Sequence, residues 1–247
     1  MEKMSLKPFL SYYGSKWRAA PHYPDPVYPH IVEPFAGAAG YSLRFPHLAV
    51  TLIEKDPMVF GVWDYLLNVK PAEILALPNI GNDQTVNDFD LPQEARWLIG
   101  FWLNGGVASP RSRPSKWMRA GSHLNSFWGP AIRLRIASQL RFIQHWKIVH
   151  GSYEDAPDIE ATWFIDPPYQ IAGSHYRQSS KHIDYPALGK WCQSRKGHVV
   201  VCENEGATWL PFRSFMSIKA SNKPDGAKWS EEVIWTRGDN LFDGLFT

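Results

Sequence analysis

An apolar run ends in a carboxylate and two prolines at Trp163-Phe164-Ile165-Asp166-Pro167-Pro168-Tyr169. The three apolar residues are typical of a buried strand, and the prolines end it because proline has no backbone N–H to donate. Each proline also biases the residue before it towards an extended backbone, so the turn after the strand is rigid. We therefore expect Asp166 at the carboxyl end of a buried strand, where open α/β sheets bind ligands.

Short apolar runs alternate with helical patterns on both sides of this strand, which predicts an α/β fold. We expect strands at residues 28–33, 49–53, 147–150, 162–165, 199–202, 215–219 and 232–236. We expect helices at residues 57–68 and 93–104, and a third one that starts at Pro130. The apolar stripe of this third helix consists of Ile132, Ile136, Leu140 and Ile143. Residues 71–90 are polar, and their hydrophobic pattern is interrupted. Residues 104–130 are predicted to form one long loop.

Length and composition exclude several classes of protein. The chain has 247 residues, 44% of them hydrophobic and 20% charged, which fits one large domain or a core with an inserted lobe. No apolar run is long enough to span a membrane, and the N-terminus lacks the apolar region of a secretory signal. Cys192 and Cys202 form no metal-binding pair and suit a reducing compartment. We expect a cytoplasmic protein with no metal and no membrane contact.

Charge is distributed unevenly along the chain. Residues 95–152 contain nine lysines and arginines but no aspartate or glutamate, so the remaining residues carry a net negative charge. Such asymmetry suggests a polyanionic partner, and the interleaved aromatic residues favour nucleic acid, although a solvated basic face is the plainer interpretation. We expect most of these aromatic residues to lie in the core. The pattern predicts a sheet domain of residues 1–70 and 146–247 with a mostly helical insertion at residues 71–145.

The segment that ends in Tyr169 predicts a particular chemistry. The Asp166 carboxylate and the Pro167 carbonyl are acceptors with few donors nearby, which suits a planar group with two N–H bonds, such as an exocyclic amine. Tyr169 could then stack on the ring that carries the amine. An Asp-Pro pair alone is more often a turn with a solvated aspartate. The full tetrapeptide after an apolar strand favours the binding site.

A small-residue turn, Glu33-Pro34-Phe35-Ala36-Gly37-Ala38-Ala39-Gly40, would let a ligand approach the backbone. It lacks the glycine fingerprint of dinucleotide-binding proteins and the Gly-Lys-Ser/Thr ending of a phosphate loop. Glu54 ends the next strand, where an acid could hold ribose hydroxyls, and a solvated strand-end acid is an equally good interpretation. No motif of a metalloprotease or a serine hydrolase is present.

Three segments together resemble the Dam-type (class alpha) DNA adenine-N6 methyltransferases of phages and bacteria. They are Pro8-Phe9-Leu10-Ser11-Tyr12-Tyr13-Gly14-Ser15-Lys16, Glu33-Pro34-Phe35-Ala36-Gly37 and Asp166-Pro167-Pro168-Tyr169, in the same order and spacing. The resemblance implies a Rossmann-like sheet that binds S-adenosylmethionine (SAM) and an inserted target-recognition lobe. It implies transfer of a methyl group to the N6 amine of an adenine flipped out of DNA, at a flipping cost of a few kcal/mol.

The resemblance also assigns residues to roles. Catalysis falls to Asp166, Pro167, Pro168 and Tyr169. SAM contacts fall to Tyr12, Gly14, Lys16, Glu33, Pro34, Phe35, Gly37, Glu54, Ser152, Tyr153 and Asp166. The candidate DNA contacts are Arg111, Arg113, Lys116, Arg119 and Arg133. Many relatives carry an acid near the position of Ser152, so SAM affinity could be lower here.

Other interpretations remain open at this point. They are an RNA adenine or protein glutamine methyltransferase, a non-catalytic binding module of the same fold, and a nicotinamide-dependent oxidoreductase. The leading aspartate disfavours glutamine as the substrate, and the incomplete glycine pattern disfavours a nicotinamide cofactor. From the sequence we assign no recognition site, partner nuclease or oligomeric state.

Overall fold

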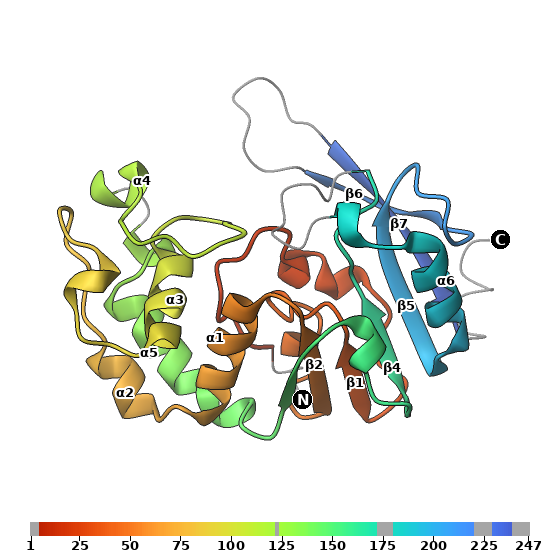
Figure 1. Ribbon diagram of the computed structural model, residues 1–247, viewed down its shortest axis with the longest axis horizontal. Coiled ribbons are helices and arrows are strands. Elements are labelled where there is room, and N and C mark those ends of the chain that lie inside the picture. Colours follow the sequence, from red (N-terminus) through yellow and green to blue (C-terminus); the bar gives the residue numbers. More distant parts are fainter. Residues whose placement is uncertain (1–4, 122–123, 172–179, 220–228, 239–247) are drawn as a thin grey trace.

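The computed structural model describes residues 5–121, 124–171, 180–219 and 229–238 (Figure 1). Its centre is a seven-stranded sheet with the order β3-β2-β1-β4-β5-β7-β6. The strands are β1 (His30–Glu33), β2 (Ala49–Glu54), β3 (Lys147–His150), β4 (Glu160–Ile165), β5 (Lys196–Asn204), β6 (Arg213–Lys219) and β7 (Trp229–Arg237). The first five are parallel, and β7 lies antiparallel between β5 and β6. The expected α/β class is confirmed, and each predicted strand is present.

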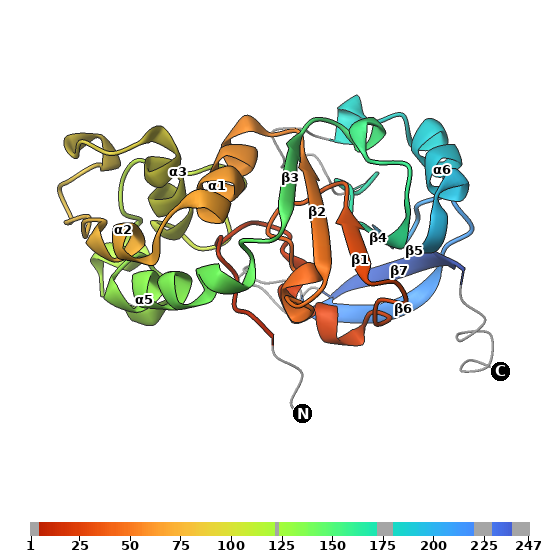
Figure 2. The same cartoon turned by 90° about the horizontal axis from the view of Figure 1, so that it is seen from below.

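The two faces of the sheet bury different clusters because side chains alternate along each strand. Ile31, Leu52 and Phe164 face one cluster, which also contains the inner face of α1 (Pro57–Asn68). Val32 and Trp163 face the other cluster, which is covered by α6 (Tyr185–Ser194). Figure 2 shows the sheet between these two layers.

Helix α1 follows directly from the local sequence. Asp56 caps it by accepting a hydrogen bond from the Met58 N–H at 2.8 Å, and Pro57 occupies the first turn, where no N–H is needed. The helix ends at Asn68, as the sequence predicts.

A helical lobe follows α1 and extends from one edge of the sheet (Figure 1). It consists of α2 (Pro71–Ala76), α3 (Gln93–Trp102), α4 (Lys116–Arg119) and α5 (Pro130–Gln139). The predicted α5 stripe is buried, and most of the aromatic residues of the acid-free segment belong to the core cluster that the lobe shares with the sheet. Trp117 is the clear exception, with 58% of its surface exposed.

Two stretches differ from expectation. Residues 71–90 were expected to be irregular but contain α2 and a 3-10 turn at Val86–Asp88, which is capped by Thr85. The long predicted loop contains α4, which begins where the Ser115 hydroxyl accepts a hydrogen bond from the Met118 N–H. These helical turns are too short to show a helical period in their hydrophobic residues, so only the residues that cap them indicate helix in the sequence.

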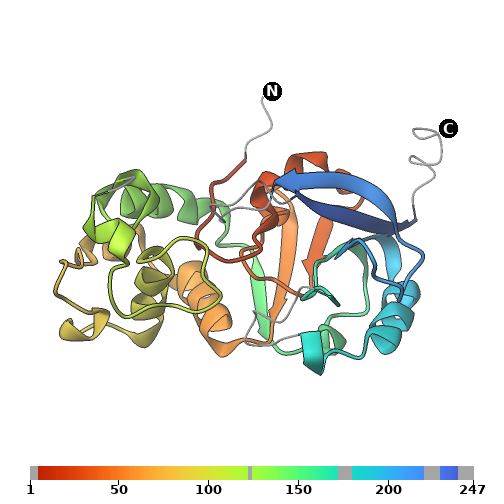
Figure 3. The same cartoon turned by 90° about the horizontal axis from the view of Figure 1, so that it is seen from above.

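The N-terminal segment runs between the lobe and the sheet (Figure 3). Its Phe9 carbonyl accepts a hydrogen bond from the Trp102 indole of α3 at 2.8 Å, and Tyr12 pairs with Val107 of the lobe. On the other side, the Leu6 N–H donates to the Leu43 carbonyl at 2.8 Å. The segment therefore joins the two parts of the molecule and delivers residues 12–16 to the end of the sheet.

Candidate active site

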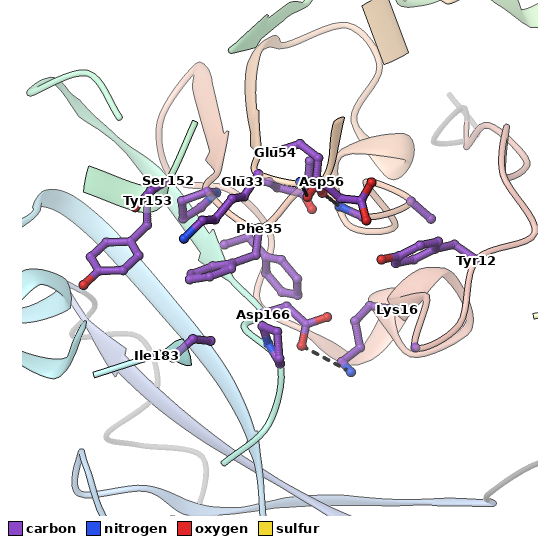
Figure 4. Close-up of a pocket in the computed structure, with 18 of the residues that line it drawn as sticks. Tyr12, Lys16, Glu33, Phe35, Glu54, Asp56, Ser152, Tyr153, Asp166 and Ile183 are labelled. Atoms are coloured by element: carbon purple, nitrogen blue, oxygen red, sulfur yellow. Dashed lines mark hydrogen bonds and ion pairs between the residues drawn. The ribbon is translucent and has the colours of Figure 1, made fainter. Parts of the chain in front are cut away.

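A pocket of about 280 Å³ opens where the strand order reverses (Figure 4). From β1 the sheet continues through β2 and β3 in one direction, and from β4 it continues through β5 in the other. Ligands of open α/β sheets bind outside the carboxyl ends of the strands at such a switch point. Residues that follow β1, β2, β3 and β4 all line this pocket, together with Tyr12–Lys16 of the N-terminal segment.

The turn after β1 is shaped by the N-terminal segment that crosses it. Gly37 has a φ of +45°, and a Cβ there would lie 3.3 Å from the Tyr12 ring. A Cβ on Gly40 would lie 2.5 Å from the Trp17 nitrogen, closer than any side chain tolerates. The glycines are therefore needed because two pieces of backbone pass close to each other. The same packing brings Tyr12, Gly14 and Lys16 to the pocket wall.

Glu54 orders this turn as well as lining the pocket. One of its carboxylate oxygens accepts a hydrogen bond from the Gly37 N–H at 3.0 Å, and the other accepts from the Asp56 N–H at 2.8 Å. Burial raises its pKa to about 7, against the effect of these backbone donors. Each carboxylate oxygen can accept more than one hydrogen bond, so Glu54 keeps capacity for a ligand hydroxyl.

Glu33 lies deeper, at the end of β1, with 3% of its surface exposed. Its carboxyl oxygen accepts a hydrogen bond from the Ser42 N–H at 2.8 Å. Burial raises the pKa of Glu33 to about 8, so the carboxyl is mainly protonated at neutral pH.

Aromatic side chains form one wall of the pocket. The Phe35 and Tyr153 rings stack with centroids 5.8 Å apart, and Tyr153 in turn meets the edge of Trp191. Ser152 caps the short turn Tyr153–Asp155, and its own N–H donates to the Asp155 carboxylate at 2.8 Å. This wall offers a flat apolar surface with a hydroxyl beside it.

Asp166 lies at the end of β4, as the sequence predicts. Its Oδ1 atom is 3.3 Å from the Lys16 ammonium nitrogen (Figure 4). The same oxygen is buried and accepts no well-formed hydrogen bond from the described residues. Burial raises the pKa of Asp166 to about 6; the Lys16 charge opposes this shift and the Glu232 charge adds to it. The site therefore presents a buried acceptor with unused capacity.

The rest of the tetrapeptide divides between the pocket and the core. Pro168 lines the pocket, and its carbonyl accepts a hydrogen bond from the Tyr185 hydroxyl at 2.5 Å. Pro167 is buried and Tyr169 is half-buried, and neither is among the described residues that line the pocket. The Tyr169 hydroxyl donates to Glu232 at 3.1 Å.

Lys16 lines the pocket and also lies close to two carboxylates and an aromatic ring. Its ammonium nitrogen lies 3.3 Å from Asp166 and 3.3 Å from Glu232, and 4.5 Å from the centre of the Tyr169 ring. The side chain therefore belongs to the Asp166 side of the pocket, where its charge is held by the buried Glu232 carboxylate and the partly buried Asp166 carboxylate.

The sequence interpretation assigned no role to Glu203 and Glu232. The Glu203 carboxylate accepts hydrogen bonds from the Gln170 N–H and from the Trp209 indole, both at 3.0 Å, and so holds the end of the turn that follows Pro168. Glu232 and Ile234 lie on the same face of β7 and are both buried, but the intervening Val233 is buried too, so a period of two in hydrophobicity does not single out Glu232.

Charge in the pocket is predominantly negative. Two lysines, Lys16 and Lys55, line the pocket together with six acids: Glu33, Glu54, Asp56, Glu154, Asp166 and Asp184. Glu33 is mainly protonated and Glu54 partly protonated at neutral pH, so the other four acids give the lining most of its negative charge. Such a lining favours a ligand that carries positive charge and disfavours one that carries a pyrophosphate.

The basic segment divides into anchored and exposed cations. Arg133 donates to the Leu77 carbonyl and to Asn79, and Arg135 donates to the Pro8 carbonyl and covers Trp102, so these two brace the lobe. Six cations of the segment are exposed: Arg111, Arg113, Lys116 and Arg119 in the loop, and Arg141 and Lys147 near β3. Lys116 and Arg119 lie on either side of the exposed Trp117 in the sequence of α4, and the Trp117 ring lies 5.0 Å from the Lys116 ammonium nitrogen. In Figure 1, α4 and the pocket-lining turn Ser180–His182 lie towards the same side of the molecule.

Two classes of feature are absent from the part of the chain that the structure describes. None of its His, Cys, Asp and Glu side chains gather in a group of three or more that could hold a metal ion. None of its helices combines the length and the apolar character that crossing a bilayer requires.

Comparisons with known proteins leave the function to be inferred from the site. No protein-family model matches the chain, and no curated protein is similar to it. Among solved structures, a conserved hypothetical protein from Streptococcus pyogenes is 11% identical, with a TM-score of 0.36 over 87% of this chain and 88% of the other.

Proposed function

We propose that this chain is a DNA methyltransferase that transfers a methyl group from SAM to the N6 amine of a flipped-out adenine. The observation that carries the proposal is Asp166 Oδ1, a buried oxygen at the switch point of the sheet that pairs with the Lys16 ammonium at 3.3 Å but accepts no well-formed hydrogen bond from the described residues. Buried polar atoms almost always take part in hydrogen bonds, so this oxygen has capacity for a donor from a ligand. An exocyclic amine is such a donor.

The chemistry of the pocket fits SAM. At neutral pH this molecule carries a sulfonium and an ammonium against one carboxylate, so its net charge is opposite to that of the acid-rich lining. The stacked Phe35 and Tyr153 rings would receive the adenine ring, and Glu54 and Ser152 would accept from hydroxyl or amino groups. The same acid-rich lining disfavours the pyrophosphate of a nicotinamide dinucleotide.

The residues at the end of β4 would act by position and charge. Bound SAM would supply an electrophilic methyl group. Asp166, ionised above about pH 6, accepts one amino hydrogen of adenine, and the Pro167 carbonyl is the proposed acceptor for the other. These two hydrogen bonds draw the nitrogen lone pair out of the ring, where it is otherwise delocalised. As the new N–C bond forms, the bond between the methyl group and the sulfonium sulfur would break, with the neutral thioether as the leaving group. The nitrogen then loses one proton, which Asp166 accepts and passes to water.

Nucleic acid as the substrate is supported by the exposed cations of the lobe. Four of them lie between Arg111 and Arg119 around an exposed tryptophan, while the anchored arginines are occupied within the protein. Lysines and arginines that contact phosphates contribute most of the sequence-independent affinity for DNA. We favour DNA over RNA because of the resemblance of the three sequence segments to Dam-type enzymes.

The decisive test is a methyl-transfer assay with defined nucleic acids. Plasmid DNA that lacks methylated bases is incubated with the protein and radiolabelled SAM, and modified positions are mapped by single-molecule sequencing. Parallel reactions contain single-stranded DNA, structured RNA, or no nucleic acid. We expect label on adenines of one short sequence in DNA. Label in RNA alone would identify RNA rather than DNA as the substrate. The absence of label from every sample would reject the proposal.

Cofactor choice is tested separately by thermal unfolding. A ligand that binds only the native state raises the melting temperature in proportion to the logarithm of its concentration. We expect SAM and its demethylated product to raise it and NAD to leave it unchanged. A rise with NAD alone would favour the oxidoreductase interpretation. A rise with SAM but no transfer to any nucleic acid would indicate a binding module.

A further inference from the structure

Glu232 lies at the centre of a buried polar cluster behind Asp166. Only 6% of its surface is exposed. Its Oε1 atom accepts a hydrogen bond from the Tyr169 hydroxyl at 3.1 Å and lies 3.3 Å from the Lys16 ammonium nitrogen. Its Oε2 atom accepts from the Tyr23 hydroxyl at 2.5 Å. Two side chains of the N-terminal segment and one that follows β4 therefore converge on one carboxylate.

The Glu232 carboxylate determines how far the Lys16 ammonium pairs with Asp166. The ammonium nitrogen is equally distant from Asp166 and Glu232, so each acid holds part of its charge. Without the charge on Glu232, the ammonium would pair with Asp166 alone and would compete with the target amine for the Asp166 oxygen. Glu232 also anchors the hydroxyl of Tyr169, while the Lys16 ammonium lies against the Tyr169 ring.

We propose that Glu232 is the positioning residue of the acceptor site, which keeps Lys16 shared and Tyr169 in place so that Asp166 stays open to the amine. This inference rests on the proposed methyltransferase function. Glu232 does not touch the substrate. It acts through Lys16 and Tyr169, and Tyr23 in turn fixes Glu232.

The charges around Asp166 determine the sign of the expected effect. Lys16 lowers its pKa, and the Glu232 carboxylate raises it. The other titratable groups that interact with Asp166 stay unchanged in the test; they are Tyr23, Glu33, Tyr169, Cys202 and Glu203. Glu232→Gln removes the charge that raises the pKa and frees Lys16 for Asp166. Both changes lower the pKa of Asp166.

The experiment compares Glu232→Gln with Glu231→Gln. Glu231 is the neighbouring residue on β7, its side chain is exposed, and it contacts Ser217 rather than the pocket, so the control loses the same charge from the opposite face of the strand. Three quantities are measured: the pH dependence of kcat, the thermal shift caused by SAM, and the titration of the Asp166 carboxyl by carbon-13 NMR.

We expect Glu232→Gln to lower kcat about tenfold and to move the acid limb of its pH profile about one unit lower. The NMR titration of Asp166 should move by the same amount, and the SAM shift should match the wild type. Glu231→Gln should match the wild type in all three. Equal behaviour of the two variants would overturn the assignment of Glu232. Because the NMR titration needs no turnover, a moved titration without wild-type methyl transfer would reject the proposed function while leaving the Glu232–Asp166 coupling in place.

A second variant covers the possibility that Glu232→Gln does not fold. Tyr23→Phe removes the donor to Oε2 but keeps the ring contacts with Phe164 and Phe215. We expect a folded protein with kcat lowered about threefold and a normal SAM shift. Wild-type kcat in Tyr23→Phe would argue against a cluster that acts through Glu232.

Discussion

The pocket and the basic loop of the lobe both depend on charge but hold it in opposite ways. The carboxylates of Asp166, at the pocket, and Glu232, behind it, are largely withdrawn from water and fixed by specific partners. Loop charges such as Arg111 and Arg113 are exposed. Buried charges act strongly over short distances and resist screening, whereas exposed charges act weakly, collectively and in a salt-dependent way. Under the proposed function, this difference assigns the chemistry to the pocket and the attraction of a polyanion to the loop.

The largest effect should come from Asp166→Ala. We expect methyl transfer to fall by two to three orders of magnitude because the variant loses a group aimed at the reacting amine. The fold and the thermal shift with SAM should be kept, since the side chain contributes little to core packing. Asp166→Asn, which keeps one acceptor oxygen, is the matched control and should lose less. Near-normal turnover in Asp166→Ala would remove this residue from the mechanism.

Replacing the four loop cations by alanine should have the next largest effect. We expect the Arg111, Arg113, Lys116 and Arg119 quadruple variant to bind DNA on the order of a hundredfold more weakly at physiological salt. Its slope of log affinity against log salt should be shallower by three to four. The SAM thermal shift should stay unchanged.

Its control comes from the same acid-free segment. Arg141 and Lys147 are also exposed but lie just before or at the start of β3, at the end of the sheet opposite the pocket. Replacing both should leave the salt slope as it is in the wild type. If the two sets of variants lower the slope equally per charge, the loop is only a solvated face.

Tyr169 bears on both regions, because in the proposed function it stacks on the adenine that is flipped out of the DNA. Tyr169→Ala loses a stacking surface worth about 1–3 kcal/mol, so we expect KM for DNA to rise about tenfold or more. Tyr169→Phe keeps the ring but loses the hydrogen bond to Glu232, so its KM should rise by less than that of the alanine variant. A phenylalanine variant as impaired as the alanine variant would show that the hydroxyl matters and stacking does not.

The last expected effect concerns stability and its change per pH unit. The pKa of Glu33 rises from 4.5 to about 8 on folding, so the folded state retains a proton that the unfolded state has lost. The free energy of unfolding should therefore fall as pH rises between about 4.5 and 8, by at most about 1.4 kcal/mol per pH unit for this group.

Urea unfolding at several pH values measures this slope. Glu33→Gln, which keeps an acceptor for the Ser42 N–H, should flatten it, and the quadruple loop variant should not. An unchanged slope in Glu33→Gln would mean that the proton is held elsewhere.

The sheet was largely predictable because its strands are short apolar runs bounded by turns. The Asp166 segment was predictable too, since chemistry and chain geometry coincide in seven consecutive residues. The partners of Lys16 were not predictable, because they depend on where the N-terminal segment crosses the sheet. Arg133 and Arg135 show the same limit: a count of charges cannot tell an arginine that braces two helices from one that faces solvent.

The crossing of the N-terminal segment over the sheet also affects how a newly made molecule matures. Lys16 is synthesised well before its partner Glu232, which belongs to β7, the last strand described. Contacts between such distant positions form late, because the intervening chain must be ordered first. A nascent chain therefore has a partial sheet long before it has a complete site. Under the proposed function, it would not methylate DNA until β7 joined the sheet, and no inhibitor would be required.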